Sequence, residues 1–96
     1  MDLKDLVESG AHKELYWALY RVRQGVAFSS PVASYSASIR ELYAILGSLR
    51  VDGSKLDLGP LDRVMLSGIS AWLCDLALPL KDPRLQFFSY YISLSL

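Results

Sequence analysis

Few residues of this 96-residue chain could do chemistry, because it contains one histidine and one cysteine. Histidine is the side chain that most readily exchanges protons near neutral pH. His12 could therefore act as a general base, with Glu14 or Asp5 and one of the serines. No nucleophile motif accompanies it. We therefore expect His12 to be a solvated residue in the first turn of a helix, and we predict no catalytic residue.

The single cysteine, Cys74, follows Trp72 and Leu73 in an apolar segment. A free cysteine in such a segment is ordinarily a small buried hydrophobic residue. A reactive thiol needs an electropositive and partly exposed setting instead. We therefore expect Cys74 to be buried and unreactive.

Metal and cofactor sites are not predicted either. One histidine and one cysteine, far apart in the chain, cannot supply the ligands of a zinc site. The segment VDGSKLDLG (51–59) contains Asp52 and Asp57 but lacks the glutamate that closes a calcium loop. The six glycines are scattered and form no phosphate-binding loop. We expect no metal, no cofactor and no enzymatic activity.

Charge is balanced, with ten basic and ten acidic residues. A balanced chain has no overall field that would draw it to nucleic acid or to an anionic membrane. A local patch could still form if the second and third predicted helices pack antiparallel. Its residues would be Arg21, Arg23, Arg40 and Arg50. The alternative function that they suggest is binding of duplex RNA or DNA by a helical dimer.

The elements that position these residues are predicted to be helices, because apolar residues recur at helical spacing and Pro or Gly falls at the ends. The expected helices cover residues 2–8, 11–27, 31 to about 49, 60 to a stop at Pro79, and 83–96. The sequence thus predicts an all-α fold. It is a small bundle of four to five helices in one domain, residues 1–96.

Three of the predicted helices have a clear apolar face. In the second helix the face consists of Leu15, Leu19, Val22 and Val26, and His12 lies mostly away from it. In the third, Ser30 is the expected cap, and a heptad seam contains Val32, Tyr35, Ile39, Leu42, Leu46 and Leu49. In the fourth, the face consists of Leu61, Met65, Ile69, Trp72 and Leu76, with Ser70 off it.

The last twelve residues, LQFFSYYISLSL (85–96), carry no charged side chain. Asp82 as a cap and Pro83 as the first residue predict a helix here. Its one narrow polar stripe would consist of Gln86, Ser89 and Ser93. The rest of its circumference is apolar and therefore needs cover from other protein surfaces.

A membrane-spanning segment is not predicted. The tail is too short to span a bilayer, and the apolar stretch 64–80 contains Asp75, which is costly within a membrane. The N-terminal MDLKDLVESG lacks the apolar run of a signal peptide, and a single cysteine fits a reducing compartment. We expect a cytoplasmic protein. Its small size is also compatible with a phage or viral accessory protein.

Aromatic side chains are numerous for so small a chain, and protein interfaces are enriched in them. The predicted partner-binding residues are Trp17, Tyr20, Tyr43, Phe87, Phe88 and Tyr91. The seam and the apolar tail exceed what one chain can cover, so we expect a homodimer through the third or last helix, or docking onto a larger protein partner. The function that we predict is a non-enzymatic protein–protein interaction module, such as a small regulator, inhibitor or assembly factor.

Overall fold

The computed structural model describes residues 1–50 and 55–96, and five α-helices contain most of them. They are α1 (Leu3–Glu8), α2 (Ala11–Ala27), α3 (Ser36–Ser48), α4 (Pro60–Ala77) and α5 (Arg84–Leu94). A short 3₁₀ helix, η1 (Val32–Ser34), precedes α3. The predicted all-α bundle is confirmed.

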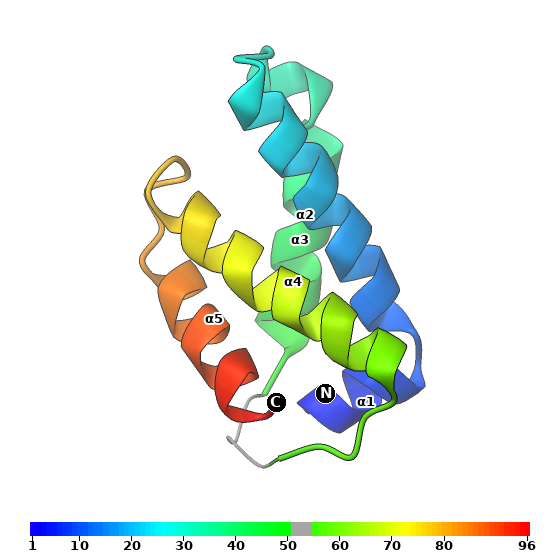
Figure 1. Cartoon of the computed structure of the whole chain (residues 1–96). Coiled ribbons are helices and arrows are strands. Elements are labelled where there is room, and N and C mark those ends of the chain that lie inside the picture. The colour runs from blue at the N-terminus through cyan, green and yellow to red at the C-terminus, as the bar shows by residue number, and fades with distance from the viewer. Residues whose placement is uncertain (51–54) are drawn as a thin grey trace.

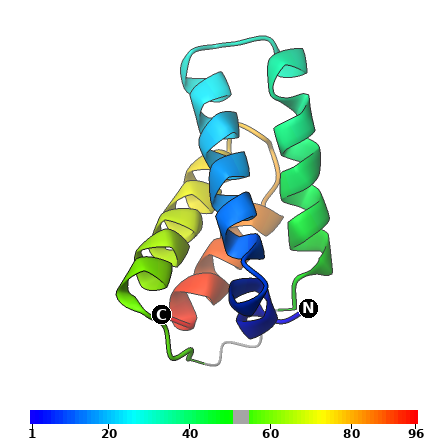
Figure 2. The ribbon, with the colours of Figure 1, turned by 90° about the vertical axis from the view of Figure 1, so that its right-hand side faces the viewer.

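The helices pack in a chain of neighbours. α2 and α3 lie side by side and antiparallel, joined at one end through η1 (Figures 1 and 2). α4 crosses α2, and α5 packs along α4 on the side away from α2 (Figure 1). The short α1 packs against α2 at the end of the bundle where both chain termini lie (Figure 2). α5 therefore has one helix, α4, as its main support.

One cluster of buried residues, mostly leucines, joins all five helices. Leu15, Leu19 and Val22 of α2 are buried as predicted, and so are Leu42 and Leu46 of α3. Burying a leucine side chain contributes about 1.5–3 kcal/mol. This cluster therefore supplies the main stabilisation of the bundle.

The third helix begins later than predicted, at Ser36 instead of residue 31. The reason is that the two preceding serines close α2 instead. The Ser30 N–H donates to the Gly25 carbonyl at 2.8 Å, and the Ser29 N–H donates to the Val26 carbonyl at 3.1 Å. Ser29 has a φ of 53°, so the pair forms the left-handed turn that commonly ends helices.

The buried face of α4 is also displaced from the predicted one. Leu66 and Leu73 are buried, whereas Leu61 is exposed and Trp72 lies at the margin, against α2. Ser70, predicted to lie off the buried face, is buried. The cause is that α4 packs against both α2 and α5, so its buried face lies between these two neighbours.

Two glycines provide a matched test of packing between α2 and α3. A Cβ atom at Gly25 would overlap the ring of Tyr35, whereas a Cβ atom at Gly47 of α3 would meet nothing within 4 Å. Alanine is the better helix former by about 0.5–1 kcal/mol. We therefore expect Gly47→Ala to raise the free energy of unfolding by about that amount. Gly25→Ala should lower it by about 1 kcal/mol or more, because overpacking outweighs propensity.

Urea unfolding followed by circular dichroism measures both changes. Equal stabilisation by the two substitutions would show that the close approach of Tyr35 to Gly25 is wrong.

Candidate interaction surface

Two reciprocal hydrogen bonds hold α5 on α4. The Ser89 hydroxyl donates to the Ser70 carbonyl at 2.6 Å, and the Ser70 hydroxyl donates to the Ser89 carbonyl at 2.8 Å. Each bond ties a side chain of one helix to the backbone of the other, which requires close contact between the helices. Ser89 was predicted to belong to a solvent-facing polar stripe, and it instead faces α4. Its polar groups are hydrogen-bonded to Ser70, which offsets the free-energy cost of burying them.

The end of α5 is also tied down. The Leu56 N–H donates to the Ser95 carbonyl at 3.1 Å, and the Arg63 guanidinium donates to the carbonyl of Leu96. Leu85 and Ile92, on the same side of α5 as Ser89, are buried in the core. The rotation of α5 about its own axis is therefore fixed at several points along its length.

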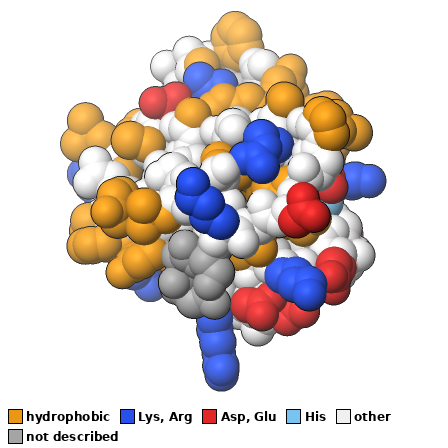
Figure 3. Space-filling model, turned by 60° about the horizontal axis from the view of Figure 1, so that its bottom comes forward, with side chains coloured by type: hydrophobic (Ala, Val, Ile, Leu, Met, Phe, Trp, Pro, Cys, Tyr) orange, Lys and Arg blue, Asp and Glu red, His pale blue; other side chains and the backbone are white. Residues whose placement is uncertain are grey.

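Four large apolar residues lie opposite the buried side of α5. Successive residues of a helix are 100° apart, so positions 87, 90, 91 and 94 share the face across from Leu85 and Ile92. The exposed fractions are 63% for Phe87, 60% for Tyr90, 41% for Tyr91 and 41% for Leu94. We call these four residues the outer stripe. In Figure 3, hydrophobic side chains gather on the left of the view, the side on which Figure 1 shows α5.

A hollow of about 280 Å³ lies next to the outer stripe, lined by Arg84, Phe87, Phe88 and Tyr91. These residues are spaced i, i+3, i+4 and i+7. In a coiled coil, four residues with this spacing form the hole into which one side chain of the facing helix inserts. The residues that line this hollow thus have the spacing that helix pairing uses.

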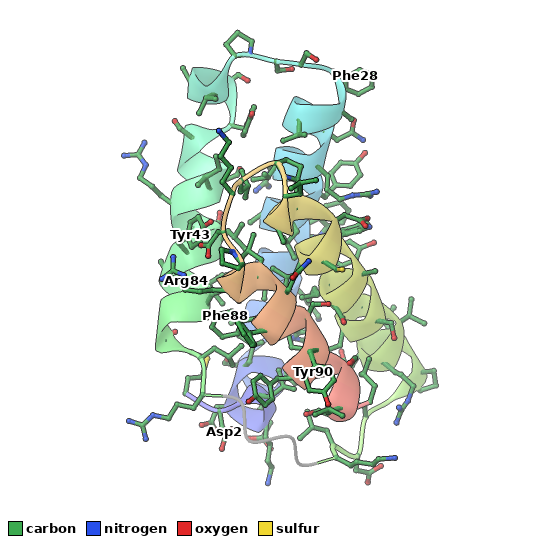
Figure 4. The ribbon with its side chains drawn as sticks, turned by 90° about the vertical axis from the view of Figure 1, so that its left-hand side faces the viewer. Asp2, Phe28, Tyr43, Arg84, Phe88 and Tyr90 are labelled. Atoms are coloured by element: carbon green, nitrogen blue, oxygen red, sulfur yellow. The ribbon has the colours of Figure 1, made fainter. Side chains whose placement is uncertain are left out.

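A second hollow, of about 360 Å³, lies between α3 and α5. Its lining consists of Tyr43, Leu46, Gly47, Leu49, Arg84, Leu85 and Phe88. Figure 4 shows Tyr43 on α3 facing Arg84 and Phe88 on α5 across this groove, with Tyr90 further along α5. We call it the α3–α5 groove. Arg84 and Phe88 line both hollows, so the two form one continuous surface.

Charge on this surface is confined to the start of α5. The Asp82 carboxylate accepts from the Arg84 backbone N–H at 3.0 Å and from its guanidinium Nη2 at 2.8 Å. This contact with Arg84 lowers the pKa of Asp82 from 3.8 to about 2. Burial raises the pKa of Tyr43, and the neighbouring Asp82 carboxylate adds to that rise. The Arg84 guanidinium also lies 5.8 Å from the centre of the Tyr43 ring.

The other two predicted partner-binding residues, Trp17 and Tyr20, lie in a separate cluster on α2 and α4. Trp17 packs edge-on against Tyr16 and Tyr20, with ring centres 5.3 and 5.6 Å apart. Both Tyr16 and Tyr20 also contact Trp72 of α4. Trp17 and Tyr20 are 51% and 40% exposed, so they form an aromatic surface of their own. The structure brings together Tyr43, Phe87, Phe88 and Tyr91 but not these two.

Two of the four candidate arginines each lie beside an acidic side chain. Arg21 of α2 lies 4.0 Å from the Glu41 carboxylate of α3. Arg23 lies 3.6 Å from Asp75 and 5.1 Å above the Trp72 ring. Arg40 and Arg50 are exposed on and just after α3. Arg21 and Arg23 are thus each turned toward an acidic partner.

His12 is buried, contrary to the prediction, with 2% of its surface exposed. Its Nε2 lies 2.8 Å from an Asp62 carboxylate oxygen at the start of α4. Its Nδ1 is buried and has no hydrogen-bond partner within the described part of the chain. The reason for the burial is that the first turn of α4 lies over the first turn of α2. His12 thus links the two helices.

Cys74 is exposed rather than buried, because the displaced buried face of α4 runs through its neighbours Leu73 and Ala77. Within residues 1–50 and 55–96, no three His, Cys, Asp or Glu side chains are close enough together to hold a metal ion. Asp52, considered for calcium, lies outside these ranges. The described helices also include none with the length and apolar character needed to cross a membrane.

Sequence reasoning missed three residues of the outer stripe and the hollow next to it, namely Arg84, Tyr90 and Leu94. The spacing of positions 87, 90, 91 and 94 was a usable signal, since it is that of a helical stripe. The stripe was overlooked because Ser89 and Ser93 were both expected to face solvent. Of these two serines, Ser93 is exposed and Ser89 is half-buried.

Comparisons of the chain with protein-family models, with curated proteins and with solved structures give no match. A proposal of function therefore rests on geometric features alone. The candidates are the outer stripe, the adjoining hollow and the α3–α5 groove.

The hydrogen bonds between Ser70 and Ser89 can be tested by a double-mutant cycle. Each of Ser70→Ala and Ser89→Ala should lower the free energy of unfolding by about 1 kcal/mol, the usual contribution of one bond. Each substitution removes a different hydroxyl and leaves both carbonyls in place, so the double variant should lose nearly the sum, with a small coupling from the two hydroxyl oxygens 3.3 Å apart. Ser67→Ala, an exposed serine of α4, is the control and should change little. A loss for either single substitution no larger than that of Ser67→Ala would contradict the reciprocal pairing.

The Asp82–Arg84 pair gives the protein a specific response to acid. Because the pKa of Asp82 is lowered in the folded state, its contribution to stability is fully present above pH 3.8 and is lost as pH falls through about 2. The difference in unfolding free energy between wild type and Asp82→Asn should therefore shrink over that range. An NMR titration of the Asp82 carboxyl group with a midpoint at or above 3.8 would contradict the pairing.

Proposed function

We propose that this chain is a non-enzymatic protein-interaction module that binds a helix of a protein partner. The contact surface is the outer stripe of α5 together with the α3–α5 groove. The observation that carries the proposal is the outer stripe itself, in which four large apolar residues lie together on the solvent side of a firmly held helix.

The size of the outer stripe supports a binding role. An aromatic side chain presents about 150–250 Å², so the exposed fractions correspond to roughly 400 Å² of largely apolar surface. Apolar patches of about 300–600 Å² are the largest on typical monomers and are often functional. Scattered exposed apolar residues need no explanation, but four adjoining ones on a single helix face do.

The shape of the surface favours a helix as the bound element. The hollow lined by Arg84, Phe87, Phe88 and Tyr91 has coiled-coil spacing. The α3–α5 groove beside it has an apolar floor that includes Leu46 and Leu85. Amphipathic helices bind in grooves of this kind by placing apolar residues at i, i+3, i+4 and i+7.

Catalysis has less support than binding. His12 is buried and held by Asp62, and Cys74 stands alone on the surface. The alternative, contact of Arg21, Arg23, Arg40 and Arg50 with nucleic acid, is weakened by the acidic partners of Arg21 and Arg23 and by the zero net charge. A regulator, inhibitor or assembly factor working in a reducing, cytoplasmic compartment fits these observations best.

Site-specific photo-crosslinking in the native cells tests the proposal. The photoreactive amino acid p-benzoylphenylalanine would replace Phe87 in one version of the chain and Tyr91 in another. Two control versions would carry it at Leu61, an exposed residue of α4, and at Trp17, in the separate aromatic cluster. The crosslinked products would be identified by mass spectrometry.

A crosslinked protein at positions 87 and 91, absent at position 61, is the expected result, because the outer stripe lies against the partner. Crosslinking at position 17 alone would assign the contact to the α2–α4 cluster and overturn the proposed surface. No crosslinked protein at any position would overturn the proposed function.

A further inference from the structure

We infer that the helix bound by the outer stripe is α5 of a second copy of this chain, packed antiparallel about a twofold axis. The inference rests on the proposed function and names its partner. α2 also lines a hollow with coiled-coil spacing, at Tyr20, Arg23, Gln24 and Ala27. That hollow contains the Arg23–Asp75 ion pair, whereas the outer stripe of α5 is uncharged.

A contact about a twofold axis needs a surface that is complementary to itself, because both copies contribute the same patch. α5 meets this requirement. It carries projecting side chains in the outer stripe, and it carries the hollow between Arg84, Phe87, Phe88 and Tyr91 that such a side chain can enter. Helix pairs interlock in this way, with a knob from each helix in a hole of the other.

The outer stripe also sets the register of the pair. In an antiparallel arrangement centred between positions 90 and 91, Phe87 lies opposite Leu94 of the second copy. Tyr90 then lies opposite Tyr91 of the second copy. Each copy thus places an aromatic ring against an apolar or aromatic neighbour, and Tyr90 and Tyr91 can make edge-to-face contacts like the one between them within the chain.

The charges on α5 are compatible with pairing of two copies and with the antiparallel direction. No Asp, Glu, Lys or Arg follows Arg84, so the two outer stripes bring no like charges together. Antiparallel helices oppose their dipoles favourably, and the exposed Arg84 at the start of one helix lies toward the C-terminal carbonyls of the other.

The exposed area of the outer stripe is comparable to the apolar core of a standard dimer interface. Standard interfaces bury about 800 Å² on each partner, with a polar rim around an apolar core. The outer stripe supplies roughly half of that area as the core. The exposed Arg84, Gln86 and Ser93 beside it can supply part of the rim.

Sedimentation equilibrium over a wide concentration range tests the pairing, with charge substitutions that distinguish its direction. Phe87→Lys and Leu94→Glu should each raise the dimer dissociation constant at least tenfold, because each places an unpaired charge in an apolar interface. The double variant should regain most of the loss, since an antiparallel pair sets Lys against Glu at both ends. Val64→Ser, at an exposed position of α4, should leave the constant unchanged. Circular dichroism checks that every variant is folded.

Four outcomes would overturn the inference. They are a wild type that stays monomeric throughout, a dimer insensitive to both single substitutions, a double variant no tighter than either single one, and stripe-dependent binding of monomers to phosphatidylcholine vesicles. A monomeric wild type whose position 87 crosslinks to a different protein would overturn the second copy as partner while leaving the proposed function intact.

Discussion

The reciprocal hydrogen bonds between Ser70 and Ser89 decide which side of α5 meets solvent, and the proposed interaction surface depends on that choice. α5 is apolar around most of its circumference, so burial of apolar area alone distinguishes its rotations weakly. Ser89 has its polar atoms satisfied where it lies against α4. With Ser89 placed there, helical geometry puts the outer stripe on the opposite side.

A rigid α5 matters because binding by a pre-ordered surface avoids much of the cost of ordering it. The Asp82–Arg84 contact anchors the start of α5, and Leu56 and Arg63 hold its end. The aromatic cluster around Trp17 lies on other helices and would remain free in a dimer built through α5. The outer stripe and the aromatic cluster around Trp17 are therefore two separate exposed surfaces of one chain.

The fold class followed from the sequence because helical spacing of apolar residues and helix-ending prolines are local signals. The helix ends and buried faces that depend on which helices pack together could not be predicted. Nothing local in SSP distinguishes a helix start from the turn that closes α2, and Ser29 and Ser30 form the turn. His12 and Ser70 looked solvent-facing because their partners, Asp62 and Ser89, are distant in sequence. The aromatic residues of the tail were predicted to bind a partner because interfaces are rich in aromatics. Which of them share the exposed face of α5 depends on the rotation of that helix, which the sequence does not determine.

Isotope-filtered NOE spectroscopy on a mixture of ¹³C-labelled and unlabelled chains tests the central claim most directly, since it reports contacts between copies alone. We expect contacts from the Phe87 ring of one copy to the Leu94 methyl groups of the other, and contacts between Tyr90 and Tyr91. Contacts between copies that involve Trp17 in place of α5, or none in concentrated samples, would contradict the assignment of the outer stripe as the interface.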